Sequence, residues 1–124
     1  AEALNALGYA LADRTERWAD ALPLIQRAIA ITPDNPAVID SLGWVYFRMG
    51  DLDQALPLLE RAFGLMQDHE IAAHLGEVLW LTGESHRAME VWHQGFAQTP
   101  DSDIIRRTLE RLKVDPELFE AARP

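Results

Sequence analysis

The stretch Asp40-Ser-Leu-Gly-Trp-Val-Tyr-Phe-Arg-Met-Gly-Asp-Leu-Asp-Gln-Ala55 decides how this chain folds. It places Gly43 inside an apolar helical pattern, follows it with a turn at Gly50-Asp51, and begins a second helical pattern that contains the small residue Ala55. The same cadence surrounds Gly8 and Gly76, and the three glycines lie 35 (43 − 8) and 33 (76 − 43) residues apart. A period of about 34 residues with this punctuation predicts an all-α solenoid of helix pairs.

Apolar periodicity and helix breakers divide the chain into eight expected helices. The three pairs are 3–13 with 16–31, 36 to the Gly50 stop with 52 to a connector at Gln67, and 70–82 with 84–98. These pairs define repeats at 1–35, 36–68 and 69–102. Residues 103–124 are expected to form a terminal helix with one polar face and a short last helix, whose Leu118 and Phe119 are available to pack back.

The mid-helix glycines indicate where the helices of a pair approach each other. A glycine there costs about 1 kcal/mol relative to alanine unless close backbone contact offsets the loss. Small residues at one position of each second helix are expected to face the glycines. The resulting structural packing residues are Gly8, Gly43, Gly76, Ala21, Ala55 and Ala88.

This pattern resembles the tetratricopeptide repeat over residues 1 to about 113. The residues that carry it are Leu7-Gly8, Ala21, Ile25, Ala28 and Pro33, then Leu42-Gly43, Tyr46, Gly50, Ala55, Leu59 and Ala62, then Leu75-Gly76, Leu79, Gly83, Ala88, Trp92 and Pro100. Two departures are Gly95, which stands where the first two repeats have alanine, and Gln67, which stands where a proline would close the second repeat. The resemblance implies a right-handed α-solenoid.

A narrower similarity rests on Leu-Gly-Tyr-Ala-Leu-Ala-Asp-Arg (7–14) followed by Asp-Ser-Leu-Gly-Trp-Val (40–45). These phrases resemble the carboxyl-terminal part of long periplasmic repeat lipoproteins of Gram-negative bacteria, of which some relatives are adaptors for a processing protease. The resemblance implies a periplasmic or outer-membrane-associated parent protein. The chain begins Ala-Glu-Ala-Leu, without an initiator Met or a signal peptide, and we expect it to be a fragment or a processed form.

Composition limits the partners. The formal net charge of −9 and the pI of about 4.7 disfavour nucleic acid as a partner, because phosphate backbones would be repelled. No cysteine is present, which excludes disulfides and thiolate metal sites and leaves the compartment open. No run of about 18 apolar residues occurs, so no membrane insertion by this segment is expected.

The resemblance implies that the first helix of each pair lines a concave groove that binds a protein or peptide segment. The exposed face of those helices carries an expected strip of aromatic and polar side chains: Asn5, Tyr9, Asp40, Trp44, Phe47, Arg48, Glu77 and Trp80. Aromatic residues are frequent anchors of binding energy. The alternative is that Trp44 and Trp80 fill the core between repeats. The co-chaperone members hold a carboxylate with paired Lys, Arg and Asn, and only Asn5 suits that role, so an apolar or basic segment is expected.

Catalytic, metal and cofactor sites are not expected. His69 and His74 are five residues apart, which turns their rings about 140° away from each other on a helix. His86 and His93 share a face without a third ligand nearby and are expected on the surface. None of the serines lies in a Gly-x-Ser-x-Gly motif, and no Gly-rich phosphate loop is present.

The basic cluster Arg106, Arg107, Arg111 and Lys113 is interpreted as a solvated cap helix balanced by Glu110 and Asp115, with docking of an acidic partner as the alternative. The leading functional hypothesis is therefore a protein-interaction scaffold that binds a partner polypeptide in its groove. The alternative is a structural segment of a larger repeat protein that forms a homo-oligomer by stacking its open first repeat on another protomer.

Overall fold

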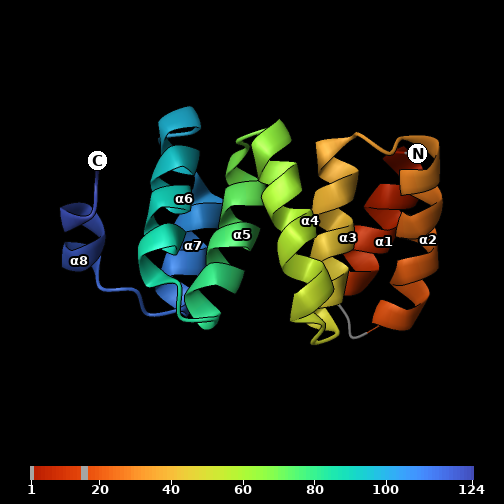
Figure 1. Ribbon diagram of the computed structural model, residues 1–124, viewed down its shortest axis with the longest axis horizontal. Helices are drawn as coiled ribbons and strands as arrows, with labels where there is room; N and C mark the ends of the chain where they lie inside the picture. The colour runs from red at the N-terminus through yellow and green to blue at the C-terminus, as the bar shows by residue number, and fades with distance from the viewer. Residues whose placement is uncertain (1, 15–16) are drawn as a thin grey trace. The chain divides into compact units, whose positions relative to one another are not determined.

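The computed structural model describes residues 2–14 and 17–124, without the side chains of residues 12–14. The described residues form eight helices and no strand (Figure 1), which confirms the all-α class. The expected helix ends agree with the observed ones within two residues. The expected start of the second helix at Glu16 lies outside the described residues. The chain divides into two compact units, residues 1–65 and 66–124.

The first unit contains α1 (Glu2–Arg14), α2 (Trp18–Ile31), α3 (Pro36–Arg48) and α4 (Leu52–Leu65). The Asn35 side chain caps α3 by accepting a 3.0 Å hydrogen bond from the Ala37 N–H. At the other end, Gly50 has φ +83°, a conformation that glycine adopts without steric cost. The Asp51 N–H then donates to the Tyr46 carbonyl at 2.8 Å, and Asp51 Oδ1 accepts from the Gln54 N–H at the start of α4.

The two pairs of this unit, α1 with α2 and α3 with α4, nest at their glycines. A Cβ added at Gly8 would lie 2.5 Å from Ile25 Cγ1, and one at Gly43 would lie 2.9 Å from Leu59 Cγ. Each entering side chain comes four residues after the alanine that was expected at the contact. The alanines themselves are fully buried one turn earlier in all three pairs: Ala21, Ala55 and Ala88.

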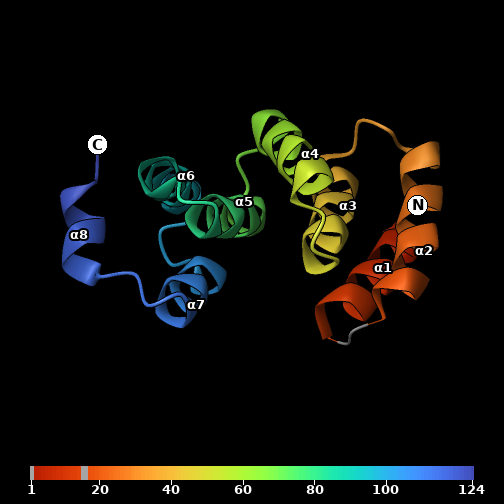
Figure 2. The same ribbon diagram turned by 60° about the horizontal axis from the view of Figure 1, so that its bottom comes forward.

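The second unit contains α5 (His69–Leu81), α6 (Ser85–Gln98), α7 (Asp103–Arg111) and α8 (Pro116–Ala121). Figure 2 shows α7 beside the α5–α6 pair and α8 to one side of it. A Cβ added at Gly76 would overlap Nε1 of the buried Trp92 indole. One added at Gly95 would lie 2.7 Å from both Ala72 Cβ and Ile105 Cδ1, because α6 meets α5 and α7 at this point.

The ends of α7 are fixed by side-chain and backbone hydrogen bonds. Ser102 is buried, and its Oγ accepts from the Ile105 N–H at 3.2 Å and lies 2.6 Å from Nδ1 of His69 on α5. Lys113 ends the helix with φ +58°, in the left-handed region where glycine is usual. Across residues 2–14 and 17–124, no helix combines the length and apolar character that crossing a bilayer requires.

Candidate functional site

Most of the expected binding residues lie on the first helices of the two pairs in the first unit. α1 and α3 pack against each other in this unit. Helical spacing of three to five residues brings the expected side chains of each helix toward one face. We call this set the α1–α3 surface, and its residues are Asn5, Tyr9, Asp40, Trp44, Phe47 and Arg48.

Trp44 and Phe47 form an aromatic pair within this surface. Their ring centroids are 4.9 Å apart with planes tilted by 35°, a geometry in which offset rings attract. Trp44 is only 4% exposed, whereas Phe47 and Tyr9 are half-buried. The Trp44 indole is therefore part of the packed interior, and the partly exposed rings of Phe47 and Tyr9 are the aromatic groups of this surface that a ligand could contact.

The polar residues of the α1–α3 surface differ in their burial and in their interaction partners. Asp40 is buried. The guanidinium of Arg48 lies 5.8 Å from the ring centroid of Trp18 on α2, a cation–π contact that draws it toward the second helix of the preceding pair. The Oδ1 atom of Asn5 is buried and finds no hydrogen-bond partner among the described residues. An acceptor in this position is costly unless a bound water or ligand N–H pairs with it.

In the second unit, the expected groove residue Glu77 lies against α7. It is 6% exposed, and its two carboxylate oxygens accept from the two terminal nitrogens of Arg111, one of them at 3.1 Å and the other closer. The ring of Trp80 is half-buried with its centroid 5.9 Å from that of Trp92 on α6. Beyond it, Leu81 is exposed at the end of α5.

The cations of α7 have different partners from those expected. Arg106 and Arg107 both pair with Asp103 at the start of the helix, the latter at 2.7 Å, and Arg111 pairs with Glu77. The ion pairs of these three arginines are thus with Asp103 and Glu77, and the part of Glu110 and Asp115 in balancing the cluster stays an interpretation. Sequence alone could not show the Arg111–Glu77 pair, because Glu77 is 34 residues from Arg111.

The expectation of a surface His93 is also wrong. His93 is 7% exposed, and its imidazole stacks on the Phe119 ring with centroids 3.9 Å apart. His86 is exposed and lies 3.7 Å from Glu90. The only sequence signal for His93 was the expectation that the last helix packs back through Leu118 and Phe119, and it is Phe119 that does so while Leu118 stays exposed.

Helix pairs nested at mid-helix glycines and closed by caps of Gly, Asn and Asp define a helical-repeat protein. Two tetratricopeptide repeat models match the sequence, at residues 1–68 and 70–94. The chain belongs to the tetratricopeptide repeat family. The repeat boundaries at 35, 68 and 102, and the similarity to periplasmic lipoproteins, stay predictions.

Two relatives extend this result. The chain is 50% identical over 112 residues to a TPR repeat-containing protein of Pseudomonas aeruginosa, covering 90% of this chain and 19% of the relative. It is 29% identical over 116 residues to tetratricopeptide repeat protein 21A of Mus musculus, covering 83% of this chain and 8% of the relative. The chain thus spans under a fifth of either relative. Tetratricopeptide repeats are non-catalytic scaffolds that generally mediate protein–protein interactions.

Proposed function

We propose that the chain is a scaffold that binds a segment of a partner polypeptide on the α1–α3 surface. The observation that carries this proposal is the tilted contact of half-buried Phe47 with the buried indole of Trp44 on α3, together with half-buried Tyr9 on the adjacent helix α1. Aromatic side chains that are already held by packing lose little entropy when a partner covers them. They supply the kind of anchor that accounts for most binding energy at protein interfaces.

The partner segment is proposed to be extended, with an apolar residue against Phe47 and basic residues beside it. The net charge of −9 attracts cations over the distance of a Debye length. A terminal carboxylate is disfavoured because the positions that would hold it carry Asn5, Tyr9, Asp40 and Trp44, and none of these is cationic. We propose that the Asn5 oxygen, which is buried without a hydrogen-bond partner in the described part of the chain, accepts from a main-chain N–H of the segment.

Selection of random peptides on the immobilised full chain tests this function. We expect enriched sequences to combine an aromatic or branched apolar residue with Lys or Arg. Their affinity should fall at least about 10-fold in the Phe47→Ala variant, since truncating a central anchor costs more than about 1.4 kcal/mol. Leu65→Ala removes an exposed apolar residue from α4 in the same unit and is the matched control. Equal binding by the Phe47→Ala chain would reject the α1–α3 surface.

Self-association is a second candidate, and the exposure of Leu7 favours it. Leu7 is 54% exposed on α1, whereas Leu42 and Leu75, which occupy the same position in the repeat, are buried. An α1 face that exposes this leucine can accept another helix, as stacked repeats do. Light scattering after size exclusion should then show concentration-dependent dimers that Leu7→Glu abolishes and Leu118→Glu does not. A monomer at all concentrations would exclude this candidate.

A further inference from the structure

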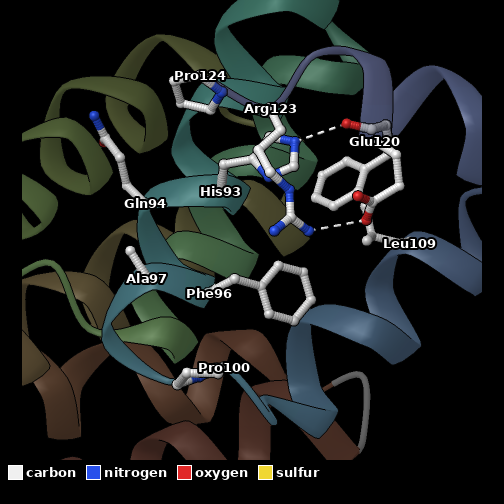
Figure 3. A pocket seen from close by; sticks show the side chains of 10 residues that line it. His93, Gln94, Phe96, Ala97, Pro100, Leu109, Glu120, Arg123 and Pro124 are labelled. Carbon is white, nitrogen blue, oxygen red and sulfur yellow. Dashed lines mark hydrogen bonds and ion pairs between the residues drawn. The ribbon is translucent and has the colours of Figure 1, made fainter.

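A cavity of about 680 Å³ lies between α6, α7 and α8 in the second unit (Figure 3). Its walls are mostly apolar, and an Arg123–Glu120 ion pair of 3.0 Å lies at its edge. The residues around it are His93, Gln94, Phe96, Ala97, Pro100, Leu109, Phe119, Glu120, Arg123 and Pro124. The volume is in the range of cavities that hold small ligands or large side chains.

The helix on one side of the cavity is held by a single side chain. α8 has six residues, and Phe119 is the only one of them that is buried. Neighbouring Leu118 is exposed. A helix this short is not stable alone, so its order depends on that one contact. Segments with so little buried apolar surface open at a small free-energy cost.

Phe119 contacts α6 through both its ring and its backbone carbonyl. The Phe119 ring stacks on His93 and meets Phe96 edge-on at 5.9 Å and Trp92 at 6.4 Å between centroids. The Phe119 carbonyl oxygen lies 2.7 Å from His93 Nε2. A carbonyl only accepts, so Nε2 carries the proton and donates it. We call Trp92, His93 and Phe96 the His93 socket, which takes an aromatic ring together with the carbonyl of the same residue.

α8 fills the socket but leaves the cavity beside it. Apolar walls that lack neighbouring atoms lose dispersion contacts, and filling them is favourable. Phe119 and Glu120 of α8 line this cavity, so only its α6 and α7 side remains when α8 leaves. On that side Phe96, Ala97 and Leu109 are not fully buried, and a ligand that seats an aromatic ring on His93 can extend apolar atoms toward them. The seated Phe119 thus indicates which chemistry the socket accepts, and the partly exposed Phe96, Ala97 and Leu109 offer a partner apolar contacts beside the socket.

We propose that the His93 socket is a second binding site, for a partner protein segment that presents a bulky aromatic residue, and that α8 occupies this site in cis until the partner displaces it. The socket lies on α6, and Leu109 of α7 lines the cavity beside it. The proposed site therefore does not depend on the α1–α3 surface. A tethered α8 competes at an effective concentration of about millimolar order, which excludes weak ligands and leaves the site to a partner that also fills the cavity.

The test uses synthetic peptides with the sequence of residues 112–124, which carry Phe, Trp or Ala at the position of Phe119. In the full chain with Phe119→Ala, α8 is released, and the Phe peptide should shift the NMR signals of the Trp92 indole and the His93 ring. The unmodified chain should bind it about 10-fold more weakly because its own α8 competes. The Trp peptide should bind more tightly than the Phe peptide, and the Ala peptide should not bind. Leu118→Ala is the control that leaves the socket closed.

A second measurement does not need the variant. In the unmodified chain, the Trp peptide should speed hydrogen exchange at the N–H groups of Phe119 and Ala122, which donate within α8 to Asp115 and Leu118. Absence of both the NMR shifts and the faster exchange at millimolar peptide would overturn the proposal. Dimers of the unmodified chain that Phe119→Ala abolishes would also overturn it, in favour of α8 exchange between two copies.

Discussion

Arg111 on α7 binds Glu77 on α5 through two hydrogen bonds, and it is the carboxylate rather than the guanidinium that is buried. Glu77 follows Gly76 and occupies the repeat position of Tyr9 and Trp44. The repeat pattern alone predicts that the Glu77 carboxylate contacts a ligand. In the structure, Arg111 of α7 neutralises this carboxylate instead. In the second unit, α7 covers the face of α5 at Glu77, whereas Trp80 and Leu81 on α5 remain at least partly exposed.

The first prediction is an asymmetry between the two sides of this pair. Arg111→Ala leaves a buried carboxylate without its partner and should lower the free energy of unfolding of the second unit by about 1–2 kcal/mol, discounted for the exposure of the arginine. Glu77→Gln leaves an exposed, solvated guanidinium and an amide that still accepts, so its cost should stay below about 1 kcal/mol. Urea unfolding followed by circular dichroism measures both. A larger loss in Glu77→Gln would contradict the assignment.

The second prediction concerns helix packing at Gly76. A methyl group there would overlap the indole of Trp92, a flat buried ring with little freedom to move, so Gly76→Ala should cost about 2–3 kcal/mol despite the better helix propensity of alanine. Gly64 on α4 has nothing within 4 Å of the same added atom. Gly64→Ala should therefore raise stability by about 0.5–1 kcal/mol. Thermal unfolding of the two variants checks the contrast, and a neutral Gly76→Ala would mean that the pair is loosely packed.

Local chemistry explains why the sequence predicted the helices well. Asn35, Gly50 and Asp51 act on groups within five residues of themselves, through caps and a positive φ, and such effects are visible in a short window. Contacts between different helices were harder to predict from the sequence. The side chains that contact Gly8 and Gly43 come one turn later in the sequence than expected. The reason is that long side chains such as those of Ile25 and Leu59 point toward the N-terminus of their helix.

The candidate site was only partly predictable for the same reason. The periodicity placed Trp44 and Phe47 on one face but could not tell that the first is buried and the second half-open. His93 was misplaced on the surface because its cover, Phe119, comes 26 residues later from a helix that depends on this contact. Pairings of this length depend on how the last helices pack and leave no local trace in the sequence.

The third prediction separates folding from binding on the α1–α3 surface. Trp44→Ala removes a ring that is almost fully buried and should cost about 3–5 kcal/mol, so the first unit should lose helical content on mild heating. Phe47→Ala removes a half-buried ring and should cost roughly half as much while weakening the binding of selected peptides. Circular dichroism and peptide titration together check this. A stable Trp44→Ala chain with impaired binding would instead mean that the indole contacts the ligand.

The fourth prediction concerns Ser102, which joins two helices of the second unit. Its Oγ caps α7 through the Ile105 N–H and bonds His69 at the start of α5, and the residue is buried. Ser102→Ala removes the cap and leaves His69 Nδ1 without this bond, which should cost about 1–2 kcal/mol. Ser85 begins α6, is exposed, and is preceded by Glu84 at the cap position, so Ser85→Ala should change stability by less than about 0.5 kcal/mol. Ser102→Thr keeps the hydroxyl and should recover part of the loss in urea unfolding. Equal stability of the two alanine variants would show that α7 is held by Glu77–Arg111 and apolar packing without the serine.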